Sequence, residues 1–372
     1  MVRNLAYYFR FKYWLSLVEE ENDSRMKLKH LVYYPLRAYV KICLNIYFQQ
    51  IEIHNYKNIP GNGPVIFLAN HQNAFLDALL IVTNNGRMTH FVARAEVFKN
   101  SLAKFLMSLI NMMPIYRIRD GWGSLKNNDA VFEKCYDILG SEDTLLVFPE
   151  GNHAQFRRLR PLSKGFTRIA FGTLDKYPDC DLQIIPIGIN YADHQNYGSK
   201  VGLHFGEALK LRSQDLKLDH INSIDLRDQV FNSLKKLISH IESENYEETL
   251  SNLLELNPDF SNPHETNKLI ESIENRDEKV ISKKVKGGFK PFKILFIINS
   301  IYAYIFWVLI KRTVKDPVML PSIKFAIAIS IFPLFYLLQA LLLKSFYGIA
   351  AAFSYFMLSI LLAKISNWKI SL

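Results

Sequence analysis

The sequence PVIFLANHQNAFLD, residues 64–77, joins an apolar run to a polar turn and then to a second apolar run. Residues 64–69 follow a glycine and include β-branched side chains, a pattern typical of a buried strand. Ala74 to Val82 contains no helix breaker and is expected to form a helix. His71 is therefore predicted at a strand-to-helix connection, where α/β sheets place their functional groups. Asp77 is near enough along the chain to hold the imidazole, and a histidine held by a carboxylate can act as a general base.

A histidine and an aspartate at this spacing are common as a helix cap and a surface charge, but three further blocks follow them in order. These blocks are Ile115-Tyr116-Arg117, Phe148-Pro149-Glu150-Gly151 and Ile185-Pro186-Ile187. Together the four blocks resemble those of the glycerolipid acyltransferase family that includes the bacterial 1-acylglycerol-3-phosphate acyltransferases. The resemblance covers Ile59 to Leu211. It implies a membrane-associated, cofactor-free acyltransferase.

The resemblance implies a role for residues in each block. His71 is the general base, Asp77 is its orienting carboxylate, and Arg117 binds the phosphate of the acyl acceptor. A guanidinium suits that task because it stays charged and forms bidentate bonds to phosphate. Glu150 would accept hydrogen bonds from acceptor hydroxyls, and Gly151 would permit close approach of the backbone.

Two of the blocks depart from the family pattern. Five residues separate His71 from Asp77, where the family usually has four, so their contact is less secure. After the third block, Asn152-His153 stands where the family has Thr-Arg. The cationic side chains that follow are expected to bind substrate in its place: Arg157, Arg158 and Lys164. Pro186 is associated with the acyl-chain side of the site, and its alternative is a proline of an edge strand.

Other chemistries find little support in the sequence. A serine esterase would need a G-x-S-x-G elbow, and none is present. The ten histidines are scattered, the three cysteines lie far apart, and no spacing predicts a metal site or a disulfide framework. The sequence also lacks a glycine-rich phosphate loop and an evident cleavable signal peptide.

Strand and helix candidates alternate from Val65 to Leu211, which predicts an α/β domain with a mixed, largely parallel sheet flanked by helices. The expected strands are Val65–Ala69, Thr89–Arg94, Ile115–Ile118, Thr144–Phe148, Leu182–Asn190 and Val201–Phe205. The expected helices are Ala74–Val82, Leu102–Met112, Asn128–Leu139 and Gly165–Tyr177, with Leu226–Ile241 the clearest helix beyond the domain.

The charge of the chain is unevenly distributed. The net charge is +10, but Ser213–Ser282 holds fifteen acidic and seven basic residues, which leaves +18 on the remainder. These basic residues are interleaved with long apolar runs, a pattern that favours an anionic bilayer surface over a nucleic acid as partner. We therefore expect a membrane partner and no nucleic acid.

Four regions follow from these patterns: an interfacial amphipathic region (residues 1–58), the acyltransferase domain (59–212), a polar helical arm (213–285) and a membrane segment (286–372). Met26–Phe48 is interrupted by basic residues, so it is expected to lie in the interface or, alternatively, to cover the domain as an ordinary amphipathic helix. The membrane segment holds three apolar runs, Ile294–Ile310, Phe325–Leu343 and Phe346–Ala363.

The first apolar run is short and has basic residues on both sides, so it is expected to dip into the membrane or lie flat on it. The other two runs are separated only by Lys344-Ser345, which predicts a hairpin that returns to the same face. Both the catalytic domain and the C-terminus would then face the cytoplasm. Three full spans are the alternative.

The sequence thus predicts an enzyme of phospholipid biosynthesis on the cytoplasmic membrane. The donor would be acyl-CoA or acyl-carrier protein, and the phosphorylated lyso-lipid acceptor 1-acyl-glycerol-3-phosphate. Glycerol-3-phosphate and another lyso-lipid are alternative acceptors, the former favoured by the longer spacing from His71 to Asp77. A catalytically silent lipid-binding protein is a further alternative, but a binding protein needs no general base.

Overall fold

The computed structural model describes residues 30–98, 105, 107–116, 127–214, 222–275, 291–314 and 316–366. Arg117 and the basic residues that precede the first apolar run of the membrane segment, apart from Lys293, lie outside the described residues. The same is true of the first four residues of the predicted amphipathic stretch Met26–Phe48.

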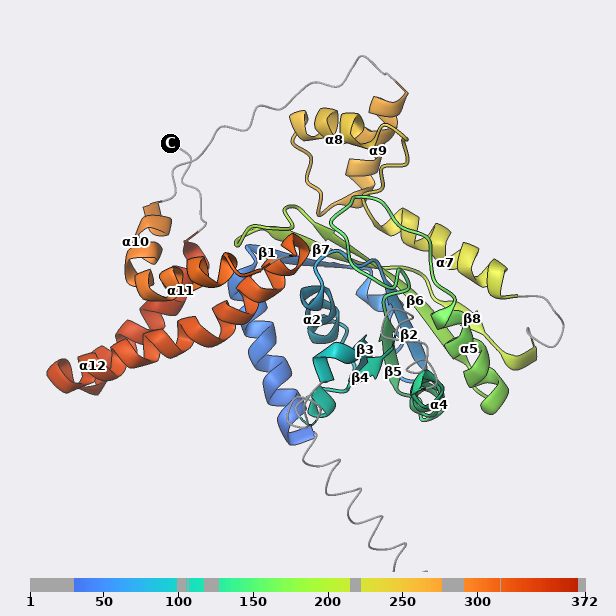
Figure 1. The fold of residues 1–372 in the computed structure, drawn as a ribbon, viewed down its shortest axis with the longest axis horizontal. Helices are drawn as coiled ribbons and strands as arrows, with labels where there is room; N and C mark the ends of the chain where they lie inside the picture. The colour runs from blue at the N-terminus through green and yellow to red at the C-terminus, as the bar shows by residue number, and fades with distance from the viewer. Residues whose placement is uncertain are drawn as a thin grey trace, which may run out of the picture.

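An eight-stranded sheet forms the centre of the molecule (Figure 1), with strand order β1-β7-β6-β2-β5-β3-β4 and with β8 paired to β6. All pairs are parallel except those that join β6 to β7 and β6 to β8. The predicted mixed, largely parallel sheet is therefore confirmed. The strands are β1 (Gln50–His54), β2 (Val65–Ala69), β3 (Thr89–Arg94), β4 (Met112–Ile115), β5 (Thr144–Val147), β6 (Leu182–Tyr191), β7 (Lys200–Phe205) and β8 (Leu209–Leu211).

Strand β2 lies in the middle of this sheet, and all five of its residues are buried. Its odd-numbered residues belong to the core on one face and its even-numbered residues to the core on the other, because side chains alternate along a strand. The parallel register pairs Leu68 with Val147 of β5 and Ala69 with Ile187 of β6. The polar residues that follow β2 and β5 therefore meet at one edge of the sheet.

Helices cover both faces of the sheet (Figure 1). Helical residues 30–47 and α2 (Phe75–Asn84) pack into the core on one face. Helices α4 (Asn127–Gly140), α5 (Gly165–Lys176) and α7 (Ser223–Leu237) form the core on the other face. Short 3₁₀ turns occupy Tyr56–Asn58 and Ala95–Phe98.

The polar helical arm is part of the packed molecule. Leu226, Val230 and Leu234 of α7 are fully buried against the sheet, and a capping box formed by Asn222 and Asp225 starts the helix. Helices α8 (Tyr246–Glu255) and α9 (Pro263–Glu274) follow and share a small core of their own with Ile241 and Phe260. The sequence predicted polar helices in this region and gave bounds only for Leu226–Ile241; it did not predict the packing of α7 on the sheet.

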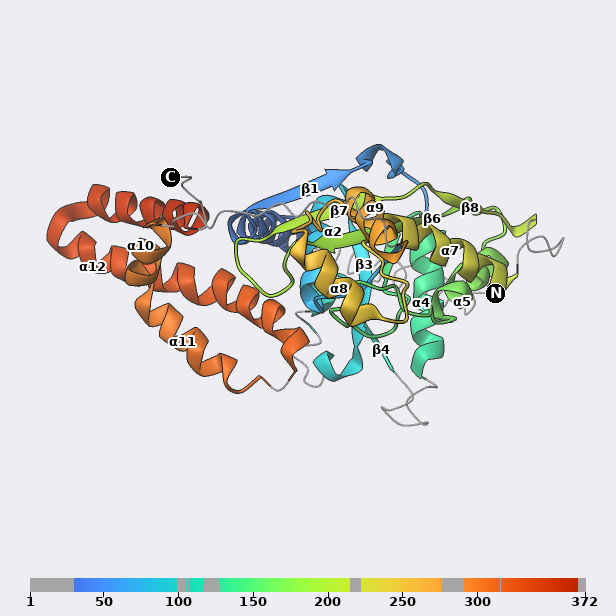
Figure 2. The same cartoon turned by 90° about the horizontal axis from the view of Figure 1, so that it is seen from above.

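The C-terminal segment consists of α10 (Pro291–Asn299), α11 (Ile301–Lys311), a 3₁₀ turn (Pro317–Met319) and α12 (Leu320–Ile365). The axes of α10 and α11 differ by 84° at the break between them. Helix α12 doubles back on itself (Figures 1 and 2) at Gly348, whose φ is +81°. The reversal was expected at Lys344-Ser345, but both of those residues are helical, and glycine is the residue that adopts such a φ freely.

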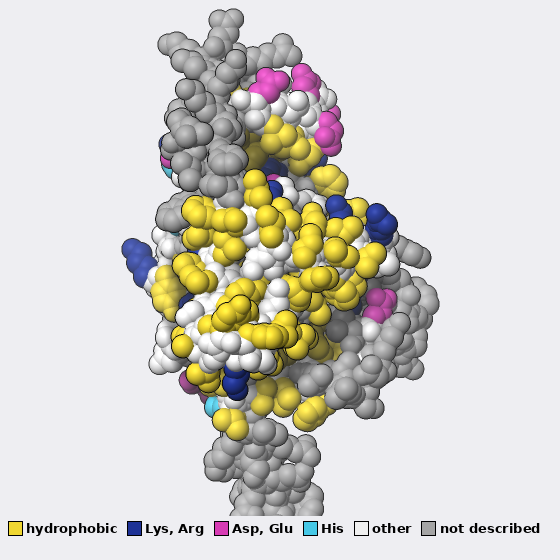
Figure 3. Space-filling model, turned by 90° about the vertical axis from the view of Figure 1, so that its left-hand side faces the viewer, with side chains coloured by type: hydrophobic (Ala, Val, Ile, Leu, Met, Phe, Trp, Pro, Cys, Tyr) yellow, Lys and Arg dark blue, Asp and Glu magenta, His cyan; other side chains and the backbone are white. Residues whose placement is uncertain are grey.

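Among the described residues, one helix (Pro317–Ile365) is long and apolar enough to cross a membrane, and the bent pair α10–α11 passes the same test if it counts as one span. The reversal of α12 exposes large apolar side chains: Phe346, Tyr347 and Ile349 are each more than 70% exposed. The face around this reversal is mostly hydrophobic, with basic side chains at its margins (Figure 3). Soluble surfaces rarely carry an apolar patch of this extent.

Both ends of α12 are attached to the sheet domain. Near its start, Lys324 Nζ donates to the carbonyl oxygen of Gln195 at 2.6 Å. Near its end, Lys364 Nζ donates to the carbonyl oxygens of Phe48 and Gln49 at 3.0 and 3.2 Å. The C-terminal segment is thus docked at its base, while its reversal projects away from the sheet (Figure 2).

Several predicted boundaries differ from the structure. Strand β4 begins at Met112, three residues before the expected Ile115, and the predicted helix Leu102–Met112 is described only in part. Strand β8 was not predicted. Strand β1 was not predicted either, and it belongs to the sheet although it precedes the expected domain boundary at residue 59.

The contact of α7 with β6 generates a stability prediction. A Cβ added at Gly188 would lie 2.0 Å from the backbone oxygen of Leu237. We expect Gly188→Ala to lower the free energy of unfolding by roughly 1–3 kcal/mol through this overlap, measured by denaturant unfolding of the purified protein. Gly61→Ala is the matched control, because a Cβ there meets nothing within 4 Å. Equal stability of the two variants would contradict this close packing.

Candidate active site

His71 and Asp77 lie in direct contact at the carboxyl edge of the sheet. The distance from His71 Nδ1 to Asp77 Oδ2 is 2.8 Å, so the extra residue between them does not separate the pair. An ionised carboxylate only accepts hydrogen bonds, so Nδ1 carries the proton and donates it. No described residue hydrogen-bonds Nε2, and the His71 side chain is 15% exposed. The second ring nitrogen is therefore left as a proton acceptor.

Asp77 is held by three further donors. Its Oδ2 also accepts the backbone N–H groups of Gln72 and Asn73, at 2.7 and 2.8 Å. Its Oδ1 accepts the Tyr191 hydroxyl at 2.6 Å. Burial, with the neighbouring carboxylate, raises the pKa of Tyr191 well above its usual value, so this hydroxyl remains a donor. Asp77 is fully buried, and its place in the first turn of α2 puts it at the positive end of the helix dipole.

The turn between β2 and α2 is fixed by its neighbours in space. The Asn70 side chain bonds both backbone groups of Ile189 on β6, donating to the oxygen at 3.0 Å and accepting from the nitrogen at 2.7 Å. The backbone oxygen of His71 accepts from the nitrogen of Ala154, at 3.1 Å. These contacts determine where the imidazole leaves the sheet.

Ser322, at the start of α12, supplies the helix cap that α2 lacks. The residue at the N-cap position is Ala74, which has no side-chain acceptor and adopts a strained φ of +47°. Ser322 Oγ accepts from the backbone nitrogen of Leu76 at 3.1 Å and donates to the oxygen of Asn73 at 2.7 Å. Ser322, which is 249 positions from Asn73 along the chain, thus holds the turn that carries His71.

Glu150 contacts the backbone of His71. Its Oε1 accepts the backbone N–H of His71 at 2.9 Å, and its Oε2 accepts from Arg160 Nε at 2.6 Å. Burial raises the pKa of this carboxyl, while Arg160 and the two hydrogen bonds oppose that rise. Gly151 has a φ of +74°, which glycine adopts freely, and a Cβ there would meet nothing within 4 Å. In the described contacts, Glu150 of the third block therefore holds the backbone of His71 in position.

Two rings flank the imidazole of His71. Phe148 stacks on it, with ring centroids 4.0 Å apart and planes 14° apart. His153 meets it edge-on at 5.5 Å, and His153 Nε2 lies 3.6 Å from Asp316 Oδ2 of the C-terminal segment. Burial, with the charges of His71 and Arg94, lowers the pKa of His153, which favours its neutral form.

The described contacts of Arg157 and Arg158 do not include His71 or Asp77. Arg157 is buried, donates to the backbone oxygens of Tyr191 and Ala192 at 3.1–3.3 Å, and lies over the ring of Phe260. Burial lowers its pKa to about 10. Arg158 donates to backbone oxygens of residues 241–243. Both guanidinium groups therefore tie the helical arm to the domain, in contrast to the substrate contacts expected for them.

The other predicted site residues have different positions. Lys164 is the N-cap residue of α5, and its side chain is exposed. Pro186 lies within β6 between its pairings with β7 and β8, so the edge-strand alternative is wrong. Proline has no N–H, and this interruption of the ladder spares it from having to donate. Arg117 lies outside the described residues; Tyr116, just before it, is fixed by two hydrogen bonds to Asn128.

Three contributors to this site were not predicted as such: Tyr191, Arg160 and Ser322. Only Arg160 gave a sequence signal, as one of several basic residues after the third block. Within the described ranges, no group of three His, Cys, Asp or Glu side chains could hold a metal ion. The assembled groups can accept a proton at His71 Nε2 and stabilise the resulting imidazolium through Asp77.

The burial of Arg157 generates a second stability prediction. We expect Arg157→Met to lower the free energy of unfolding by about 3 kcal/mol, because it removes charge-assisted bonds to buried carbonyl oxygens and the stacking on Phe260. Arg168→Ala is the control, since that guanidinium is 54% exposed and pairs on the surface. If Arg157→Met left stability unchanged but weakened substrate binding, Arg157 would be a substrate-binding residue, as the sequence predicted.

Part of the chain is similar to known proteins. Residues 50–190 match the family model described as Acyltransferase. The chain is 26% identical over 117 residues to glycerol-3-phosphate O-acyltransferase 1 of Saccharomyces cerevisiae, which is 32% of this chain and 15% of that protein. It is 25% identical over 210 residues to the chloroplastic 1-acyl-sn-glycerol-3-phosphate acyltransferase BAT2 of Brassica napus, which is 52% of this chain and 58% of that protein.

A solved structure with similarity to this chain is the 1-acyl-sn-glycerophosphate acyltransferase PlsC from Thermotoga maritima, at 20% identity and a TM-score of 0.43. That match covers 57% of this chain and 80% of the other. The matches to both named curated relatives span less than two thirds of the relative's own length. Residues 50–190, which contain His71, Asp77 and Glu150, thus match the Acyltransferase family model, and the chain is similar to a protein named as a 1-acyl-sn-glycerol-3-phosphate acyltransferase.

Proposed function

We propose that the protein is a membrane-associated O-acyltransferase that moves a fatty acyl group from acyl-CoA or acyl-carrier protein to 1-acyl-glycerol-3-phosphate. The observation that carries this proposal is the contact of His71 Nδ1 with the buried Asp77 carboxylate, which leaves Nε2 as the base. The product is phosphatidate, an intermediate of phospholipid biosynthesis. No cofactor takes part in this reaction scheme.

The transfer needs one base and one oriented hydroxyl. Nε2 of His71 takes the proton of the acceptor hydroxyl as its oxygen attacks the thioester carbonyl carbon. A C–O bond forms, the C–S bond breaks, and the imidazolium returns the proton to the departing thiolate. Asp77 stabilises the imidazolium between these steps, and its other donors keep it in place. General-base catalysis supplies about 10²–10⁴-fold, so positioning of the two substrates and stabilisation of the oxyanion supply the remainder.

The acceptor is proposed to be phosphorylated. Arg117 is proposed to bind the acceptor phosphate, on the strength of its place in the second block. Glu150 is proposed to position the backbone of His71, with Gly151 leaving open space beside it for substrate. Pro186 stays a proposed contact on the acyl-chain side, and exposed Lys164 a proposed contact of the anionic substrates.

Glycerol-3-phosphate is the second candidate acceptor. The five residues between His71 and Asp77 favour it, and the similar protein of Saccharomyces cerevisiae is named for glycerol-3-phosphate. The similar protein of Brassica napus is named for 1-acyl-sn-glycerol-3-phosphate, over a larger share of this chain. We therefore place the lyso-lipid first.

The C-terminal segment supports attachment to a membrane. The apolar reversal of α12 would enter the bilayer and return, which keeps the sheet domain and the C-terminus on the same, cytoplasmic face. The bent pair α10–α11 suits a segment that enters the membrane without crossing it. Helical residues 30–47, which expose Leu31 and Ile42, would lie at the interface.

Transfer of a labelled acyl group from each donor type to a panel of acceptors, by the purified protein, tests this function. We expect His71→Ala to lower turnover by at least about 100-fold without loss of expression, because it removes the base from a turn. His264→Ala is the matched control, since that histidine is exposed on α9. Retention of more than about a tenth of the activity in His71→Ala would rule out general-base catalysis by this residue.

Asp77→Asn tests the role of the carboxylate. We expect at least roughly a tenfold loss in kcat with little change in KM, because an amide cannot neutralise the imidazolium. The measurement is steady-state acyl transfer with saturating donor. A loss confined to KM would mean that Asp77 acts on substrate binding alone.

Ser322 is proposed as a positioning residue for the His71 turn. We expect Ser322→Ala to lower kcat about tenfold with a smaller effect on KM, because it loses the bond to Asn73 in the turn and the bond to Leu76 in the first turn of α2. Ser322→Thr keeps the hydroxyl and should restore most of the rate. Ser330→Ala is the control, since that hydroxyl donates only to Ala326 within α12. If Ser322→Ala lost stability while kcat stayed unchanged, the contact would be structural only.

A further inference from the structure

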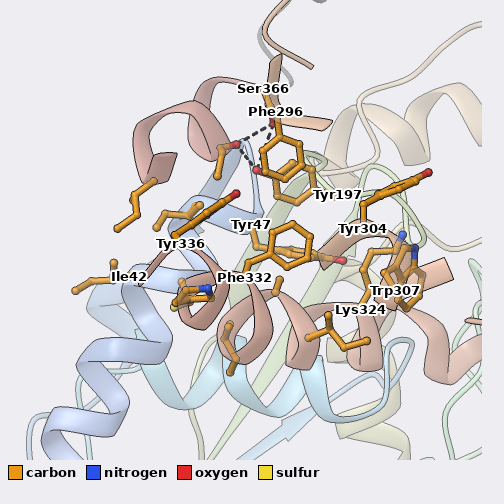
Figure 4. Close-up of a pocket in the computed structure, with 18 of the residues that line it drawn as sticks. Ile42, Tyr47, Tyr197, Phe296, Tyr304, Trp307, Lys324, Phe332, Tyr336 and Ser366 are labelled. Carbon is orange, nitrogen blue, oxygen red and sulfur yellow. Dashed lines mark hydrogen bonds between the residues drawn. The ribbon is translucent and has the colours of Figure 1, made fainter. Parts of the chain in front are cut away.

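A cavity of about 480 Å³ lies between the C-terminal helices and helical residues 30–47, outside the His71 site (Figure 4). Its volume falls within the roughly 300–1,000 Å³ of small-molecule sites. All of its lining residues fall outside residues 50–190, the part that matches the family model. Most of the lining comes from the C-terminal segment and from helical residues 30–47, and Asn196 and Tyr197 contribute from the connection between β6 and β7.

The lining of this cavity is apolar along most of its extent. Ile42 and Tyr336 lie toward one side (Figure 4), and the ring of Phe296 stacks on those of Tyr197 and Phe332, with centroids 5.9 Å apart in each pair. Many of the lining side chains come from α12, whose outer face is among the most exposed apolar surfaces of the molecule. A ligand that fits here needs a long apolar part.

The charged side chains that line the cavity are all basic. Lys324 and Lys293 line it, no aspartate or glutamate does, and neither ammonium forms an ion pair with a described carboxylate. Lys324 lies 5.4 Å from the ring of Trp307, beside Tyr304 (Figure 4). Its ammonium uses one donor on Gln195, which leaves two for a ligand.

We propose that this cavity binds a bilayer lipid with an acidic head group. The acyl chain lies among the aromatic and aliphatic side chains, and the head group meets Lys324 and Lys293. Charge complementarity selects an acidic lipid, because an apolar site whose only charged groups are ammonium groups is completed by an anion. A lipid here joins the C-terminal segment to the sheet domain at the point where Lys324 bonds Gln195, two residues from Ser322.

Trp307 provides a direct probe of this site. The chain has four tryptophans, and changing Trp14, Trp122 and Trp368 to Phe leaves Trp307 alone. This protein is placed in neutral phosphatidylcholine nanodiscs that contain a rising fraction of brominated-chain lipid, either phosphatidate or phosphatidylcholine. We expect quenching of Trp307 to saturate, with the half-saturating fraction about tenfold lower for phosphatidate.

A matched reporter on the same helix measures contact with the bulk bilayer. Trp307→Phe with Leu309→Trp moves the probe to a side chain that is 56% exposed and outside the cavity lining. There we expect quenching in proportion to the brominated fraction, with no preference between the two lipids. Identical behaviour of the two probes would overturn the proposal.

Two further variants test occupancy and charge separately. Ala328→Phe fills the cavity and should abolish saturation, whereas Ala326→Phe, outside the lining on the same helix, should not. Lys324→Gln should remove most of the preference for phosphatidate. His71→Ala should leave the binding unchanged, so a failed acyl-transfer assay would not bear on this site. Saturable quenching that survives Ala328→Phe, or a preference that survives Lys324→Gln with Lys293→Gln, would overturn the proposal.

Discussion

The buried carboxylate of Asp77 is the group on which the rest of the site depends. It receives four hydrogen bonds, from the imidazole of His71, two backbone N–H groups and the Tyr191 hydroxyl. A buried carboxylate without such donors would favour its protonated form and could no longer hold an imidazolium. The two backbone donors come from the turn after β2 and the hydroxyl comes from β6, so the parallel pairing of these strands makes the pair possible.

Specific contacts tie the segments around residues 50–190 to the sheet domain. The start of α12 caps α2 through Ser322, and Asp316 faces His153 beside His71. The helical arm is fastened by Arg157 and Arg158, whose guanidinium groups bond backbone oxygens near Tyr191 and in residues 241–243. The C-terminal segment that we propose to enter the bilayer is thereby in direct contact with the turn that carries His71. The start of α12 and the position of this turn are thus linked through the two hydrogen bonds of Ser322.

Sequence patterns predicted the central part of the fold well, because its strands are short apolar runs with clear boundaries. Strands β2 and β3 have the predicted bounds, and the pairing of His71 with Asp77 follows from their place after β2. The start of β4 was predicted too late, because Met112 and Met113 are not β-branched and gave no strand signal. The reversal of α12 was predicted at a polar pair, but it lies at Gly348, because the backbone conformation of a reversal is one that glycine adopts freely.

Other residues were beyond the reach of local patterns. Arg157 and Arg158 follow the third block in sequence, but only the positions of β6 and the helical arm decide that their guanidinium groups bond backbone oxygens there. Ser322 and Tyr191 are far from Asp77 along the chain, and a serine or tyrosine in an apolar stretch carries no sign of its distant partner. Contacts of this kind depend on tertiary packing alone.

The central claim is that Asp77 fixes His71 as the tautomer with its proton on Nδ1, which leaves Nε2 free to act as the base. Nitrogen-15 NMR of the protein labelled at histidine, at a pH where the imidazole is neutral, measures this directly, with His71→Ala used to assign the signals. We expect a protonated Nδ1 and an unprotonated Nε2 for His71, and loss of this preference in Asp77→Asn. A neutral His71 with its proton on Nε2 in the unaltered protein would contradict the account.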